Sequence, residues 1–142
     1  NDAVAPQLAS DALGHVLLVW QAWDHDRFRV LGRFFDPIIG WQAAEFIDTY
    51  SQGFAREPAV ALDPRGNAVV VRVEVNEQAA QVWARRFTPM AGWTSPEMIS
   101  SQIILFAQHP TVALGAGGAG MAAWLQGNSG FVQIAFNRLK SP

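Results

Sequence analysis

Short hydrophobic runs alternate with clusters of glycine, proline and polar residues along the 142-residue chain. The runs are rich in β-branched and aromatic residues, and turn signals interrupt them about every 8–12 residues, as is typical of β-strands. The clearest pair of runs covers residues 58–63 and 67–75, joined by Asp63-Pro64-Arg65-Gly66. These residue types favour a tight turn, because Asp bonds its own backbone, Pro presets φ and Gly accepts a positive φ. The pattern therefore predicts antiparallel strands and leaves little room for helices.

The hydrophobic pattern returns with a fixed period of 52 residues. Three sets of positions carry this period: Pro6, Pro58 and Pro110; Gly14, Gly66 and Gly118; and the pairs Gly40-Trp41 and Gly92-Trp93. A fixed period indicates tandem supersecondary units that bury their hydrophobic faces against one another. The chain is thus expected to be one repeat domain, residues 1–142, with repeats at about 5–56, 57–108 and 109–142.

Each full repeat has room for four strands. In the second repeat they are predicted at 58–63, 67–75, about 80–87 and about 93–99, whereas the third repeat ends before its fourth strand. Four-stranded units of about 40–50 residues are typical of β-propeller blades. The predicted fold class is therefore all-β, with three four-stranded antiparallel propeller blades, the third lacking its last strand. A β-trefoil, which also has three four-stranded repeats, is the alternative.

Three blades do not complete a ring, because propellers usually have about four to eight. An unpaired strand edge invites pairing with another chain, and two-fold symmetry is the commonest arrangement of homo-oligomers. A homodimer joined through the unpaired blade edges is therefore expected to complete the ring. Excision from a longer array of repeats is the other explanation.

Composition and charge narrow the classes of function. The chain is 50% hydrophobic and only 15% charged, below the roughly 25% of a typical soluble domain, so we expect extensive buried surface. A net charge of −2 gives no basic face for nucleic acid, and no apolar run is long enough for membrane insertion. The chain has no cysteine, and His15, His25 and His109 lack metal-ligand spacing, so neither a metal nor a cofactor is predicted.

The repeat carries a motif, read from Pro6-Gln-Leu-Ala-Ser-Asp11 with Gly14-His15 and from Pro58-Ala-Val-Ala-Leu-Asp63 with Gly66-Asn67. With Trp20 and the later Gly-Trp pair, it resembles a tandem repeat of exported and cell-surface bacterial proteins. Arg72 replaces the tryptophan, and Gly115 the aspartate, of this pattern. The resemblance implies propeller-type blades and a periplasmic, cell-surface or secreted location. It implies no functional residue.

Two local motifs are predicted to be turns. The segment 115–120 matches the dinucleotide fingerprint G-x-G-x-x-G, but the period aligns it with the turn at 63–68, and the residues after it form a predicted strand rather than the helix that the motif needs. Asp11 and Asp63 could be cation ligands, but an aspartate that closes a tight turn explains both better.

Polar residues that differ between the repeats are the better candidates for ligand binding. The turn between the second and third strands reads Trp23-Asp24-His25-Asp26-Arg27 in the first repeat. In propellers this turn lies on the same face as the linker between blades. An aromatic ring beside carboxylate, imidazole and guanidinium groups suits a sugar, a peptide or a weakly held cation. The predicted ligand-binding residues are Trp23, Asp24, His25, Asp26, Arg27, Asn76, Glu77 and Asn128.

The first expectation for function is a non-catalytic binding or scaffolding module for a carbohydrate or protein, because the variable residues lie in loops. The alternative is a glycan-processing hydrolase or lyase, which requires two positioned carboxylates, and the clustered acids are Asp24, Asp26, Glu74 and Glu77. No nucleophile motif is present, and no catalytic residue is predicted. A purely structural segment is the third possibility. The apolar linker 103–106 is expected to contact a partner or to be tucked under the sheet.

Overall fold

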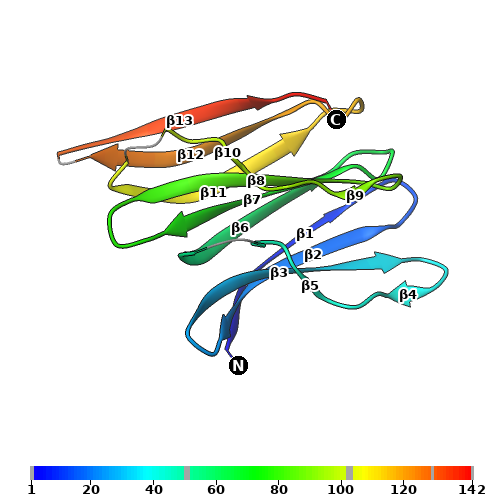
Figure 1. Ribbon diagram of the computed structural model, residues 1–142. Helices are drawn as coiled ribbons and strands as arrows, with labels where there is room; N and C mark the ends of the chain where they lie inside the picture. Colours follow the sequence, from blue (N-terminus) through cyan, green and yellow to red (C-terminus); the bar gives the residue numbers. More distant parts are fainter. Residues whose placement is uncertain (1, 50–51, 102–103, 129, 142) are drawn as a thin grey trace.

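Three antiparallel sheets, one from each repeat, stack on one another from the N-terminal to the C-terminal end of the chain (Figure 1). The computed structural model describes residues 2–49, 52–101, 104–128 and 130–141, and these ranges contain strands and turns without a helix. No helix that could span a membrane therefore occurs among these residues.

The strands follow the repeat. The first sheet consists of β1 (Ala3–Ser10), β2 (Val16–Asp24), β3 (Arg27–Asp36), β4 (Gly40–Trp41) and β5 (Glu45–Phe46). The second sheet consists of β6 (Phe54–Leu62), β7 (Ala68–Val75), β8 (Ala80–Thr88), β9 (Gly92–Trp93) and β10 (Glu97–Met98). The third sheet has β11 (Phe106–Leu114), β12 (Gly120–Asn128) and β13 (Phe131–Leu139). The all-β antiparallel prediction is confirmed, and within the described residues the third sheet consists of these three strands.

The predicted fourth strand is in fact two short pairings. In the first sheet β4 and β5 both pair with β3, and in the second β9 and β10 both pair with β8. Pro96 lies in the interruption of the second sheet, where a proline has no N–H to offer the ladder. Hydrophobic patterning does not reveal such a break.

A bulge in the first strand of every sheet lies at the residue before the repeat proline. Ala5, Glu57 and His109, here called the bulge positions, have φ values of 52°, 50° and 50°. The pairing register shifts at these positions in β1, β6 and β11. Because proline cannot donate to the ladder, a bulge takes up the extra residue and re-aims its side chain. Each first strand begins before its proline, so the strand predicted from Pro58 starts at Phe54.

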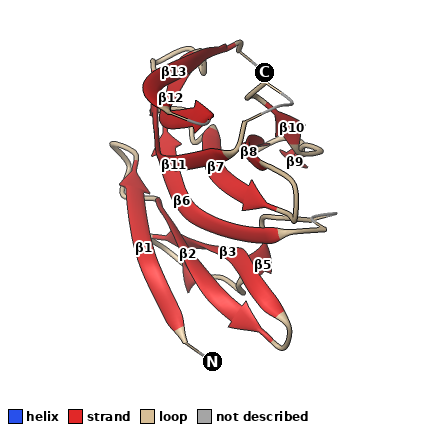
Figure 2. Ribbon diagram, turned by 90° about the vertical axis from the view of Figure 1, so that its left-hand side faces the viewer, coloured by secondary structure: helices blue, strands red, loops and turns tan. Residues whose placement is uncertain are grey.

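Alternating side chains bury the two faces of the second sheet. Leu17 and Val19 of β2 pack with Val70 in the core between the first and second sheets. Val71 faces the other way and packs with Trp124 in the core between the second and third sheets. The first strands β1, β6 and β11 lie next to one another along one side of the molecule (Figure 2). The shared barrel of a β-trefoil would require strands of different repeats to pair. Within the described ranges such strands do not pair, so the arrangement is propeller-like.

The local motifs behave as the repeat predicts. Asp63 Oδ1 accepts hydrogen bonds from the backbone N–H groups of Arg65 (2.8 Å) and Asn67 (2.9 Å). In the glycine-rich segment Gly118 has a φ of 77° and closes a turn before β12 begins. In the linker 103–106, Ile104 is 3% exposed in the core between the second and third sheets, whereas Leu105 is 59% exposed. Ile103 lies outside the described residues.

Candidate functional site

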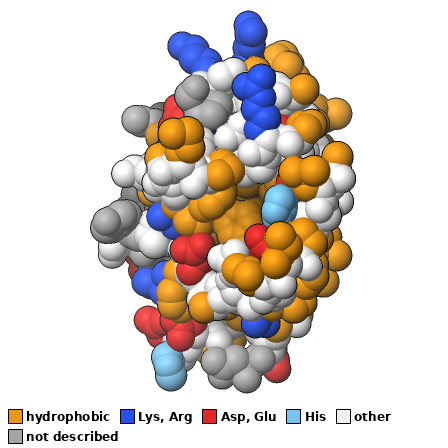
Figure 3. Space-filling model, turned by 90° about the vertical axis from the view of Figure 1, so that its right-hand side faces the viewer, with side chains coloured by type: hydrophobic (Ala, Val, Ile, Leu, Met, Phe, Trp, Pro, Cys, Tyr) orange, Lys and Arg blue, Asp and Glu red, His pale blue; other side chains and the backbone are white. Residues whose placement is uncertain are grey.

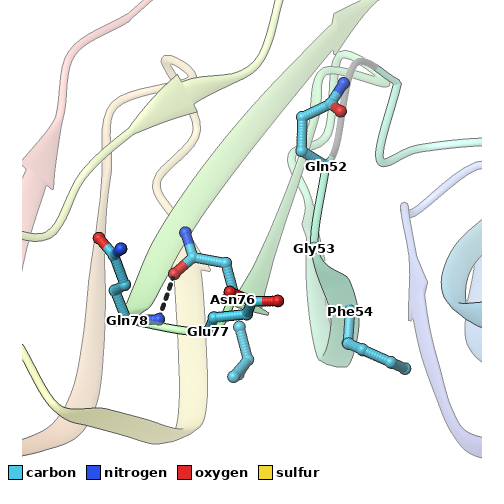
Figure 4. Close-up of a pocket in the computed structure, with 7 residues that line it drawn as sticks. Gln52, Gly53, Phe54, Asn76, Glu77 and Gln78 are labelled. Atoms are coloured by element: carbon cyan, nitrogen blue, oxygen red, sulfur yellow. Dashed lines mark hydrogen bonds between the residues drawn. The ribbon is translucent and has the colours of Figure 1, made fainter.

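The turn between β7 and β8 and the linker that precedes β6 enclose an open groove of about 600 Å³ (Figure 4). This turn groove is lined by Gln52, Gly53, Phe54, Val75, Asn76, Glu77 and Gln78. Figure 4 shows the turn residues on one side and the linker residues on the other. A Cβ atom at Gly53 would overlap the carbonyl oxygen of Val75. Glycine is therefore needed for the linker to lie against the end of β7.

The turn that forms one wall is held by its own first residue. Asn76 Oδ1 accepts hydrogen bonds from the backbone N–H groups of Gln78 (3.0 Å) and Ala79 (3.0 Å), as Asn does in Asx turns. That oxygen is consequently occupied in shaping the wall. Glu77 and Gln78 are exposed, so their carboxylate and amide groups are the ones available to a ligand.

Exposed aromatic rings connect the turn groove to the turn of the first repeat. The Trp23 and Phe54 ring centroids are 6.3 Å apart, and Trp23 also meets Phe28 edge to face at 5.0 Å. Trp23 is 37% exposed and Phe54 is 44% exposed. Large apolar rings left accessible beside polar groups are typical of ligand-binding surfaces.

The remaining predicted residues of the first turn do not converge on one point. Asp24 Oδ2 lies 3.5 Å from Arg29 Nη1, so its carboxylate is held beside β3. His25 occupies the turn with a φ of 58°, and its side chain is 92% exposed. Asp26 is exposed and Arg27 begins β3.

Asn128 has a different role in the third repeat. Its Oδ1 accepts a hydrogen bond from the backbone N–H of Leu105 (3.0 Å) and so fixes the linker before β11. The structure therefore brings Trp23, Asn76 and Glu77 together around Phe54, while Asn128 is not among the residues that line the groove.

Glu74, one of the clustered acids, belongs to a buried ion pair. Its Oε2 lies 3.3 Å from Nη2 of Arg72, which is 1% exposed. Burial lowers the pKa of Arg72, while the charges of Glu74 and Asp48 oppose that shift. Asp48 is itself fully buried, with Oδ2 2.7 Å from Arg29 Nε. Glu74 therefore serves as the partner of Arg72 and is not a candidate for a catalytic carboxylate.

The residues that sequence reasoning missed lie at the bulge positions of neighbouring first strands. Glu57 Oε2 accepts a 2.6 Å hydrogen bond from the backbone N–H of His109, and the imidazole Nδ1 is 3.7 Å away. Glu57 Oε1 lies 3.7 Å from Arg56 Nε, and the Glu57 N–H donates to Gln21 Oε1 at 3.1 Å. This places a hydrogen-bonded carboxylate three residues from Phe54 on the same strand, which is about 10 Å along β6.

A weak signal for this pair exists in the sequence. The residue before the repeat proline is Ala5, Glu57 or His109, so it varies although the proline that follows it is constant. The approach of two first strands that are not paired with each other brings Glu57 to His109, and the period alone does not predict it. Among the described residues no group of three or more histidine or acidic side chains is positioned to hold a metal ion.

The stacked antiparallel sheets, with their first strands side by side, define a propeller-like β-protein. No family model and no curated protein matches the chain. A glycosyl hydrolase from Bacteroides ovatus matches with a TM-score of 0.56 and 12% identity, over 91% of this chain and 47% of that chain. A structure from the GH130 family of mannoside phosphorylases, which contains glycoside hydrolases that target β-1,2 mannosidic linkages in Candida mannan, matches with a TM-score of 0.55 and 12% identity. It covers 100% of this chain and 52% of that chain.

These neighbours correct the first expectation for function. A non-catalytic binding or scaffolding module was expected, but the similar structures are glycan-processing enzymes, so the alternative, a glycan-processing hydrolase, fits them better. At 12% identity the likeness establishes the fold alone. The chain also spans about half the length of the solved structures that it matches.

Proposed function

We propose that this chain forms part of a propeller-like glycan-processing hydrolase or phosphorylase, and that the turn groove binds part of the glycan. The observation that carries the proposal is the exposed Trp23 and Phe54 pair beside Glu77 and Gln78. Aromatic faces pack against the apolar side of a sugar ring, while carboxylate and amide groups bond its hydroxyls.

Glu57 is the carboxylate that we assign to the chemistry. The His109 N–H fixes its position, whereas Glu77 lies on an exposed turn and is better suited to binding. A glycosidase requires a second carboxylate several ångströms away, and in this proposal the rest of the assembly supplies it. The similarity to the mannoside-acting structure makes β-1,2-linked mannosides the first compounds to test, and an exported protein would meet such glycans outside the cell.

The assembly that we propose is a ring completed by a second copy of the chain. Arg85 Nη1 of the second sheet donates to the carbonyl of Ile47 in the first sheet (3.3 Å), and Asn137 Nδ2 of the third donates to that of Ile99 in the second (2.8 Å). Arg33 occupies the equivalent position in the first sheet, beside a shallow hollow formed with Leu18, Trp20 and other residues. That outer face thus resembles the faces that neighbouring sheets cover.

A binding measurement with β-1,2-mannobiose tests the groove. We expect NMR shifts at residues 52–54 and 75–78, and a loss of at least tenfold in affinity in Phe54→Ala, corresponding to about 1.4 kcal/mol. Met90→Ala is the matched control, because Met90 is 99% exposed and does not line the groove.

Release of mannose, assayed with and without phosphate, then separates hydrolase from phosphorylase. Glu57→Gln should abolish turnover but keep the hydrogen bond from His109, since an amide oxygen also accepts. Sugar binding elsewhere, or unchanged turnover in Glu57→Gln, would contradict the proposal.

A further inference from the structure

A second cavity lies at the other end of the strands from the turn groove. This inter-sheet pocket, of about 510 Å³, is formed by the turn after β1, the end of β3, the turn after β6 and the end of β8. The nine residues of β6 separate it from the turn groove by about 26 Å. The volume is within the roughly 300–1,000 Å³ of small-molecule sites. Figure 3 shows hydrophobic side chains gathered at the centre of this face, beside a histidine and acidic side chains.

The wall of the inter-sheet pocket is apolar and aromatic. Phe34 of the first sheet and Phe87 of the second have ring centroids 4.5 Å apart. Leu62, Pro64 and Pro89 extend this wall. Such a surface favours the apolar body of a ligand and can hold a cation against the faces of its rings.

The rim carries negative charge. Asp11 Oδ2 lies 2.7 Å from His15 Nδ1, and His15 Nε2 lies 3.9 Å from Asp36 Oδ2. Glu45 Oε1 accepts a hydrogen bond from Trp93 Nε1 (2.7 Å). Three carboxylates therefore stand against a single arginine, Arg65, among the residues that line the pocket.

The two aspartates remain ionised at neutral pH. Backbone N–H groups of Ile38 and Ile39 bond Asp36 Oδ1 and lower the pKa of Asp36. Burial alone would raise the pKa of Asp11, but hydrogen bonds from His15 and Leu13 outweigh it, so this pKa is also lowered. Asp36 Oδ2 lies 3.9 Å from His15 Nε2.

The repeat provides an internal control for this pocket. One period after Phe34, Asp36 and His15 come Arg86, Thr88 and Asn67. At the corresponding place between the second and third sheets, the cavity is lined instead by Arg86, Arg138 and Lys140, with Glu97. The fold therefore does not require the aromatic and acidic residues at the first junction.

We propose that the inter-sheet pocket binds a small organic amine, with its apolar body against Phe34 and Phe87 and its ammonium group at Asp36. An ammonium donates to the carboxylates of the rim and complements their charge. This site is separate from the turn groove and does not depend on glycan processing.

The test compares three ligands that share a benzyl group: benzylamine, benzyl alcohol and phenylacetate, titrated into the full chain and followed by NMR. Benzylamine should shift residues 11–15, 34–36 and 62–66 and bind about tenfold tighter than benzyl alcohol, and phenylacetate should bind most weakly. Equal binding of all three, tighter binding of phenylacetate, shifts outside the pocket or no binding would each overturn the proposal. β-1,2-Mannobiose displacing benzylamine would identify a sugar site instead and would also overturn it.

Variants then test the assigned contacts. Asp36→Asn keeps an oxygen for the Ile38 and Ile39 N–H groups but removes the charge, so benzylamine binding should weaken about tenfold while benzyl alcohol binding is unchanged. Asp26→Asn removes an exposed carboxylate from the other end of the molecule and should change neither. An unchanged benzylamine affinity in folded Asp36→Asn would refute the assignment.

Discussion

Individual residues in this protein shape turns through their side-chain oxygens. Asp11 is such a residue, because its carboxylate accepts hydrogen bonds from the backbone N–H groups of Leu13 (2.8 Å) and His15 (3.0 Å) as well as from the imidazole. The period predicts this from the spacing of Asp11 and Asp63 before Gly14 and Gly66. It does not predict that His15 completes the arrangement, because Asn67 takes that position in the second repeat.

The pKa of Asp11 leads to a prediction about pH and stability. Its pKa is lowered in the folded chain, whereas the unfolded chain has the ordinary value near 3.9. The carboxylate therefore contributes stability that is fully present above the unfolded pKa and is lost as pH falls through the folded pKa. In urea unfolding from pH 7 to pH 2, the free energy should decrease below about pH 4, and Asp11→Asn should show a smaller decrease. A profile parallel to that of the unmodified chain would contradict this; Asp26→Asn is the control.

At the scale of elements, one pair of positions on the second strand is filled by different chemistry in successive repeats. Trp124 Nε1 donates to Gln126 Oε1 (2.9 Å) in β12, while Arg72 Nη2 donates to Glu74 Oε2 (3.3 Å) at the equivalent positions of β7. The departure of Arg72 from the repeat motif is thus matched by Glu74. The Trp124 N–H is compatible with burial because Gln126 accepts its hydrogen bond. In the second repeat Glu74 satisfies only one nitrogen of Arg72, because Arg72 Nε and Nη1 are buried without a hydrogen-bond partner.

Exchanging the two pairs tests this compensation. Arg72→Ala should destabilise the chain by about 3–5 kcal/mol, because it leaves Glu74 buried without its partner. Arg72→Trp combined with Glu74→Gln restores the pair of the third repeat and should recover most of that loss. Chemical denaturation of the single and double variants measures the effect, and a double variant as unstable as Arg72→Ala would rule the compensation out.

The elements also show what the sequence could predict. Strands and turns follow from hydrophobic alternation and turn residues. The position of Asn76 and Glu77 near the linker also follows, because in propellers the turn between the second and third strands lies on the same face as the linker between blades. The bulge positions do not follow, because an inserted residue leaves hydrophobic alternation on both sides intact. Without the bulge, and without the approach of β6 to β11, the contact between Glu57 and His109 has no sequence signature.

At the scale of the whole molecule, the first and third sheets each have one apolar face that no other sheet of the described residues covers. Phe136 and Ile134 are 70% and 74% exposed on β13, and their partners across the ladder lie on the face of β12 opposite Trp124. On the first sheet, Trp20 is the repeat equivalent of Trp124, which is only 4% exposed between sheets. Exposed apolar faces of this kind mark interaction surfaces.

Light scattering checks this assignment. We expect the full chain to have twice its mass of 15.5 kDa, and Trp20→Asp or Phe136→Asp to reduce it to a single chain, because a buried unpaired carboxylate is costly. Met90→Asp, at an exposed turn position, should leave the mass unchanged. A concentration-independent monomer in the unmodified chain would exclude self-association.

The two uncovered faces differ from each other, and that difference governs how copies can add. A contact between unlike faces is head-to-tail. Each added chain covers one face of its neighbour and leaves the same face of its own exposed, so a further chain can add. A ring closes with two chains only when the three stacked sheets of one chain together span half a circle about the ring axis. With any other rotation the same contact generates larger rings or an open filament, so the angle between neighbouring sheets sets whether this protein closes on itself or polymerises.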